Sequence, residues 1–137
     1  MLDFRPILFI VGILLTTLSI AMVLPAAVDA AVGNPDWRAF LASAGLTLFI
    51  GIALILTNRS RDMSLSIRQA FVLTTACWTA VAAFGALPFL LAELELDFTD
   101  AFFESMSGIT TTGSTVLVGL DTAPPGILLW RALLQWL

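Results

Sequence analysis

Three long apolar runs fill most of the first two thirds of the chain. They cover residues 7–24, 39–57 and 70–92, and none of them contains a charged side chain. A helix crosses the hydrocarbon core of a bilayer with roughly 20 apolar residues, each adding about 1.5 Å. Each run is therefore predicted to be a transmembrane helix. Pro25 is expected to end the first helix, and Pro88 lies near the end of the third.

Polar connectors separate these runs. The 25–38 stretch contains Gly33 and Pro35 and is predicted to be a turn-rich connector, with Asp36 placed to cap the second helix. In the 58–69 loop, Ser64 or Ser66 can cap the third helix, because a side-chain oxygen there accepts from the free amides of the first turn. A fourth apolar run begins at Gly126 and continues through residues 126–137.

The composition agrees with an all-helical membrane protein. The 137 residues are 59% hydrophobic and 12% charged, with a mean hydropathy of +1.00. Soluble domains average about 25% charged residues, so this chain has too few charges to solvate a soluble surface. The predicted spans use nearly all of its length, so any nucleotide-driven regulation is expected from a partner.

The missing residue types exclude several kinds of chemistry. The chain has no histidine and one cysteine, Cys77. Histidine-based catalytic and metal sites, an internal disulfide and multi-cysteine zinc sites are therefore excluded. The net charge of −4 argues against nucleic acid as a partner and suits a surface that meets cations.

The arginines predict an orientation, because cytoplasmic loops of membrane proteins carry an excess of positive charge. One arginine precedes the first run, and three lie between the second and third: Arg5, Arg59, Arg61 and Arg68. Arg38 stands alone between the first and second runs, beside acidic residues. The N-terminus and the 58–69 loop are therefore predicted to be cytoplasmic, and the 25–38 connector and residues 93–125 to start from the outside.

The first run has a second interpretation, as a secretory signal peptide. Residues 26–30 contain small side chains that resemble a cleavage site. The run is longer than the apolar region of a typical signal peptide. A retained helix is favoured because the later arginines agree with it.

Residues 97–109 are predicted to form a short helix. Asp97 or Thr99 can cap it, and an apolar stripe recurs every three or four residues at Phe98, Ala101, Phe102, Met106 and Ile109. About 12 residues rise only about 18 Å, which is too short to cross a bilayer. The helix is therefore predicted to be re-entrant, entering from outside and stopping partway.

Residues 110–115 read Thr-Thr-Thr-Gly-Ser-Thr, uncharged and rich in hydroxyls. Irregular backbone at membrane depth is tolerated where it is buried in protein or lines a water-filled path. With Gly113 permitting unusual backbone angles, successive carbonyls can replace the water shell of an alkali cation. A surface turn or capping cluster is the alternative. The neighbouring span, the acidic entry and the short helix favour a pore loop.

Residues 103–115 (Phe-Glu-Ser-Met-Ser-Gly-Ile-Thr-Thr-Thr-Gly-Ser-Thr) and 129–137 (Leu-Trp-Arg-Ala-Leu-Leu-Gln-Trp-Leu) resemble the first pore region of the TrkH family of bacterial potassium uptake proteins. This family belongs to the Trk/Ktr/HKT superfamily. The resemblance implies two peripheral helices in residues 1–69, then a first pore repeat in residues 70–137. That repeat would comprise a helix (70–92), a pore helix (97–109), a filter (110–115) and an incomplete last helix (126–137).

The same resemblance implies the ligands and the partners. The main-chain carbonyls of Thr111 and Thr112 would bind potassium, with Thr110 and Gly113 completing the stack. The threonine hydroxyls would either add a ligand or bond back to the pore helix. The family pore has four filter loops, whereas this chain supplies one. A homodimeric membrane assembly and a cytoplasmic TrkA-like nucleotide-binding regulatory subunit are also implied.

Acidic residues near this loop are candidates for concentrating cations at an outer mouth. The residues considered are Glu104, Asp100 and Asp121, with Glu93, Glu95 and Asp97. Asp97 and Asp100 have a structural alternative as helix cap and dipole partner, and the others as solvated charges. Glu104 lies mid-way along the short helix and needs a partner there. Arg131 is predicted either to reach the outer headgroups or to pair with a carboxylate near the filter.

Together these features predict potassium permeation across the bacterial cytoplasmic membrane, without enzymatic chemistry and with potassium as the permeant ligand. A non-conducting membrane scaffold is the main alternative, because only one pore loop is present. A membrane enzyme subunit is weaker, since no nucleophile–base pair is evident.

Overall fold

The computed structural model describes residues 4–33, 35, 37–59, 64–92, 96–115 and 125–136. These residues form six helices: α1 (Arg5–Val32), α2 (Trp37–Thr57), α3 (Ile67–Gly85), α4 (Leu87–Leu91), α5 (Phe98–Ile109) and α6 (Pro125–Trp136). Three segments are long and apolar enough to cross a membrane, namely Arg5–Val32, Trp37–Thr57 and Ile67–Leu91. The prediction of an all-helical membrane protein is confirmed.

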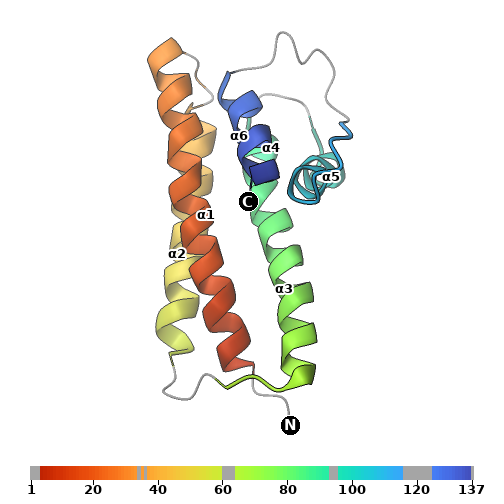
Figure 1. Cartoon of the computed structure of the whole chain (residues 1–137). Helices are drawn as coiled ribbons and strands as arrows, with labels where there is room; N and C mark the ends of the chain where they lie inside the picture. The colour runs from red at the N-terminus through yellow and green to blue at the C-terminus, as the bar shows by residue number, and fades with distance from the viewer. Residues whose placement is uncertain are drawn as a thin grey trace.

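Helices α1 and α2 form a long antiparallel pair (Figure 1). The buried side chains of α1 recur every three or four residues and make one stripe: Ile7, Val11, Leu15, Leu18, Met22 and Ala26. Gly12 and Gly51 bring the two backbones together, since a Cβ on Gly12 would lie 2.8 Å from the carbonyl oxygen of Gly51. Small residues let membrane helices approach closely and gain dispersion contacts.

The prediction that Pro25 ends the first helix is wrong. Helix α1 continues to Val32 and contains Pro25, which is buried. Membrane helices tolerate proline because neighbouring helices support the interrupted backbone, and here Ala26 and Ala27, which follow it, favour the helix. The helix ends at Gly33, which has a φ of 84° and donates its amide to the carbonyls of Ala30 and Asp29. The 25–38 connector is correspondingly short, and the Asp36 cap falls outside the described residues.

Helix α3 begins three residues earlier than predicted. Ser66 caps it and accepts a hydrogen bond from the amide of Gln69, whose side chain accepts from the amide of Ser66 in return. This confirms one of the two predicted caps. The predicted 70–92 helix is interrupted at Ala86, and the short α4 follows with proline in its first turn. Pro88 has no amide N–H to donate to the carbonyl four residues earlier, and its ring crowds that carbonyl, which explains the interruption.

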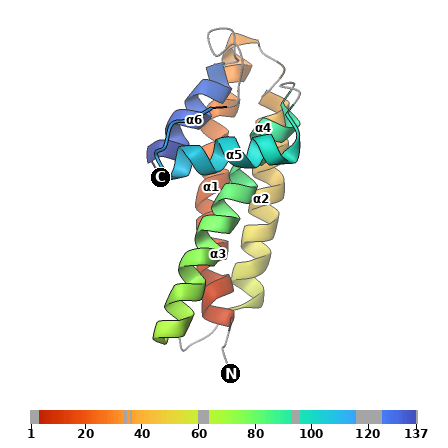
Figure 2. The same ribbon diagram turned by 90° about the vertical axis from the view of Figure 1, so that its right-hand side faces the viewer.

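The remaining helices occupy one end of the long ones. Helix α5 lies crosswise to α3 and reaches from α4 toward α6 (Figure 2). Helix α6 packs against α1 and α5. The rings of Phe40 and Trp130 meet edge to face with centroids 6.3 Å apart. The end of α2 and the starts of α1 and α3 lie at the opposite end from α6 (Figure 1).

Candidate functional site

Helix α5 sets the position of the loop that follows it. The side chain of Asp97 caps the helix by accepting a hydrogen bond from the amide of Asp100 at 2.8 Å, as predicted. The buried face consists of small and polar residues: Ala101, Glu104, Ser105, Ser107 and Gly108. The apolar stripe that indicated the helix in the sequence is not this buried face, and of its members only Ala101 is fully buried.

Close backbone contact explains this choice of face. A Cβ on Gly108 would lie 2.9 Å from the Cβ of Leu134 in α6. A Cβ on Gly85 in α3 would lie 2.6 Å from the hydroxyl of Ser105. Small residues on α5 thus allow it to lie tightly across two helices, while Phe98 and Phe103 are exposed. The end of α5 is fixed between α3 and α6.

The chain doubles back along α5 after Ile109. The amides of Thr111 and Thr112 donate to the carbonyls of Gly108 and Ser107, each at 3.0 Å, and the amide of Gly113 donates to Ser107 at 3.5 Å. These bonds satisfy carbonyl groups that a helix end otherwise leaves unpaired. The turn requires positive φ angles of 57° at Thr111 and 78° at Gly113. Such an angle is uncommon for a β-branched residue and marks local backbone strain.

The threonine hydroxyls bond within this turn. Thr110 donates its hydroxyl to the carbonyl of Met106 at 2.8 Å, and Thr111 donates to the carbonyl of Thr110 at 2.7 Å. The hydroxyls of Thr110 and Thr112 are 2.8 Å apart. For Thr110 these contacts favour the structural alternative, in which the hydroxyl bonds back to the helix. Within the described ranges, no hydrogen bond reaches the carbonyls of Thr111, Thr112 and Gly113.

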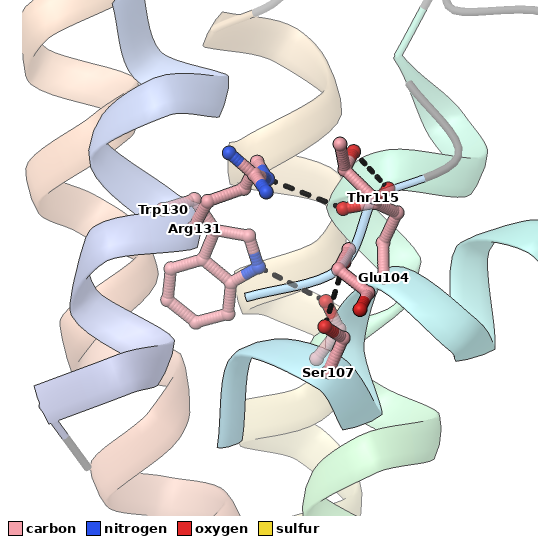
Figure 3. Close-up of polar contacts among 7 residues, drawn as sticks. Glu104, Ser107, Thr115, Trp130 and Arg131 are labelled. Atoms are coloured by element: carbon pink, nitrogen blue, oxygen red, sulfur yellow. Dashed lines mark hydrogen bonds and ion pairs between the residues drawn. The ribbon is translucent and has the colours of Figure 1, made fainter. Parts of the chain in front are cut away.

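The far end of the loop is attached to the middle of α5 (Figure 3). Ser107 donates its hydroxyl to the carbonyl of Ser114 at 2.6 Å. The hydroxyl of Thr115 donates to the carboxylate of Glu104. Residues 110–115 are nevertheless exposed. The loop is therefore held to α5 by the amides of Thr111, Thr112 and Gly113 and by its far end, while its residues stay open in this chain.

Glu104 also pairs with Arg131. The Nε of Arg131 lies 3.1 Å from the second carboxylate oxygen, and the Glu104 side chain is 1% exposed. The neighbouring Trp130 donates its indole N–H to the carbonyl of Gly85 at 2.9 Å. The pairing expected as one alternative for Arg131 is present. It favours a positioning role for Glu104 over that of a cation-attracting mouth acid.

The other acidic candidates are placed differently. Asp100 is half-buried in the first turn of α5. Glu93, Glu95 and Asp121 lie outside the described residues. Within the described ranges, no group of three or more His, Cys, Asp or Glu side chains is suited to a metal ion. Residues 110–115 themselves carry no carboxylate, so their oxygen atoms are those of the backbone and of the hydroxyl side chains.

Sequence reasoning missed one buried carboxylate. Asp29, near the end of α1, is fully buried and accepts a hydrogen bond at 2.7 Å from the amide of Gly126 in the first turn of α6. The two residues are 97 positions apart. Sequence spacing alone carries no signal for this contact. The one sequence feature related to this contact is the glycine at position 126, which leaves room for the carboxylate of Asp29.

These features define an integral membrane protein that carries a half-length helix and a returning loop. The family model described as "TrkH: Cation transport protein" matches residues 37–137. The chain therefore belongs to the TrkH family of cation transport proteins.

Similar proteins extend the match to almost the whole chain. The Trk system potassium uptake protein TrkH of Escherichia coli K12 is 43% identical over 136 residues, which are 98% of this chain and 28% of that protein. TrkI of Halomonas elongata is 39% identical over 132 residues, 96% of this chain and 27% of that protein. The crystal structure of the potassium transporter TrkH from Vibrio parahaemolyticus superposes with a TM-score of 0.92 at 40% identity.

The match covers 98% of this chain and 29% of the Vibrio protein. The chain thus spans less than a third of the length of the relatives it matches.

Proposed function

We propose that this chain provides the first repeat of a potassium pathway and that residues 110–115 form its filter loop. The observation that carries the proposal is that amides of the loop are hydrogen-bonded to α5, whereas three of its carbonyls, those of Thr111, Thr112 and Gly113, receive no hydrogen bond within the described residues. The names of the relatives, which are potassium uptake proteins and transporters, support the same ion.

The chemistry is ion dehydration without covalent steps. Backbone carbonyl dipoles replace the water that a monovalent cation leaves behind. Helix α5 ends at the loop, so the partial negative charge of its C-terminus adds to the attraction. Inward flow of a cation gains roughly 2.3 kcal/mol per charge per 100 mV of membrane potential. No catalytic residue is required.

One loop does not enclose an ion. Residues 110–115 are exposed in this chain, and the family resemblance implies that three further loops surround the ion. The pathway is therefore a property of an assembly of four repeats, of which these 137 residues supply one. Residues 97–109 act as the re-entrant pore helix in this proposal, and Asp121 and Asp100 as acids near the mouth.

The setting follows from the same proposal. The protein resides in the bacterial cytoplasmic membrane with its N-terminus and the α2–α3 loop in the cytoplasm, as the arginines predict. A homodimeric assembly and a cytoplasmic nucleotide-binding regulatory subunit are proposed from the family alone. Copurification from membranes tests both.

A chimera tests the function with all repeats present. These 137 residues replace the matching segment of the Vibrio parahaemolyticus TrkH, and the product is reconstituted into liposomes. We expect rubidium, used as a potassium tracer, to enter faster than sodium, with the unmodified Vibrio protein as the reference. Insertion without tracer flux would support the non-conducting scaffold instead.

A further inference from the structure

Glu104 combines two properties that seldom occur together. It is a carboxylate with 1% of its side chain exposed, and it lies mid-way along a helix that borders the proposed ion path. A buried charge is costly unless it is paired and hydrogen-bonded. Both carboxylate oxygens are used here, one by Arg131 and one by the hydroxyl of Thr115 (Figure 3). The group therefore has a structural task specific to this place.

Arg131 supplies the opposite charge from another element. It comes from α6, and its Nε lies 3.1 Å from Glu104. The pair carries no net charge, so its long-range attraction for cations is weak. Its effect is local, because it fixes the carboxylate between α5 and α6. Geometry therefore favours positioning over electrostatic collection of ions.

Thr115 connects this pair to the loop. At its start, the loop is held by amides that bond to Gly108 and Ser107. At its other end it is held by two bonds, from the hydroxyl of Ser107 to the carbonyl of Ser114 and from Thr115 to Glu104. The carbonyls of Thr111 and Thr112 lie between these attachments. Their spacing depends on both ends remaining in place.

We propose that Glu104, held by Arg131, is a specificity-determining positioning residue that sets the filter geometry through Thr115. Potassium and sodium differ in radius and not in charge, so discrimination depends on where the carbonyls stand. This inference rests on the proposed function. It adds that the Arg131–Glu104–Thr115 connection determines which ion is preferred.

The test removes one hydroxyl. Thr115→Val keeps the shape and branching of the side chain and removes the donor to Glu104. In the chimera described above, the rubidium-to-sodium flux ratio is expected to fall about fivefold, which corresponds to one lost hydrogen bond. Thr115→Ser keeps the hydroxyl and is expected to restore most of the ratio. The matched control is Thr74→Val in α3, whose hydroxyl donates only to Ala70 in its own helix.

A second variant separates positioning from charge. Glu104→Gln keeps the size of the side chain but removes its charge, so the ion pair with Arg131 is lost and the charge-assisted bonds to Arg131 and Thr115 weaken. If Glu104 acts by positioning, the rubidium-to-sodium flux ratio of Glu104→Gln is expected to be reduced by the same factor at low and high ionic strength. If Glu104 instead attracts cations to the mouth, the variant is expected to show reduced rubidium flux at low ionic strength only, because salt screens exposed charges.

The outcomes are distinct. A reduced ratio in Thr115→Val with recovery in Thr115→Ser, at equal membrane levels, supports the inference. Ratios equal to the parent in both Thr115→Val and Glu104→Gln overturn it while the proposed function stands. A parent chimera that inserts but does not prefer rubidium overturns both. If Thr115→Val fails to insert, the rubidium-to-sodium flux ratio of Glu104→Gln is used instead. A reduced ratio supports the inference, and a ratio equal to the parent overturns it.

Discussion

The carboxylate of Asp29 accepts a hydrogen bond from the amide of Gly126, 97 positions later in the chain. Asp29 is buried near the end of α1, and Gly126 stands at the start of α6. A carboxylate at a helix N-terminus satisfies free amides and interacts favourably with the helix dipole. Helix α1 thus fixes the beginning of α6, the helix that carries Arg131. Helix α1 is therefore part of the support of the candidate site.

Gly126→Ala is expected to destabilise the fold. A Cβ at this position would lie 2.3 Å from a carboxylate oxygen of Asp29, so the buried contact must open. We expect a loss of about 1–3 kcal/mol, typical of overpacking, measured as a lower unfolding temperature in detergent. The matched control is Gly45→Ala in α2, where nothing lies within 4 Å of the added carbon. Equal unfolding temperatures for the two variants would contradict the account.

Gly113→Val is expected to abolish selective flux without preventing insertion. Gly113 has a φ of 78°, which a β-branched residue adopts only with strain. The loop then has to change conformation, at a cost of order 1–3 kcal/mol. Rubidium and sodium fluxes through the chimera measure the effect, together with the amount of protein in the membrane.

Gly33→Val is the control for backbone strain. Gly33 has a similar φ of 84°, has nothing within 4 Å of an added Cβ, and lies at the end of α1. It should lower stability while leaving the rubidium-to-sodium ratio unchanged. Normal selectivity in Gly113→Val, or an equal loss of selectivity in Gly33→Val, would contradict the assignment of residues 110–115 as the filter.

The orientation of the helices is testable by fusion. A reporter inserted next to Ser64, between α2 and α3, is expected to register the cytoplasm because three arginines surround this loop. A reporter next to Gly33, between α1 and α2, is expected to register the outside. A reversed pair of signals would overturn the orientation.

The sequence predicted the spanning helices well because their apolar runs have the length that a bilayer demands. It also offered two candidate caps for each of two helices, and Ser66 and Asp97, one from each pair, are the caps observed. These signals depend only on neighbouring residues, so they can be recognised in the sequence without the fold. The division of the protein around residue 69 and the role of residues 110–115 remain predictions.

The misses have tertiary causes. Pro25 was expected to end a helix, but packing of α1 against its neighbours carries the helix past it. The apolar spacing of residues 97–109 predicted a helix but not its buried face, which close contact with α3 and α6 sets in favour of small residues. For Arg131, two partners were left open, and only the fold brings Glu104 within reach.

The filter assignment is tested most directly by anomalous diffraction from thallium ions in crystals of the chimera. Thallium is a heavy monovalent stand-in for potassium. The account predicts an anomalous peak in contact with the carbonyl oxygens of Thr111 and Thr112. A peak held by the carboxylate of Glu104, or a pathway with no thallium beside residues 110–115, would contradict it.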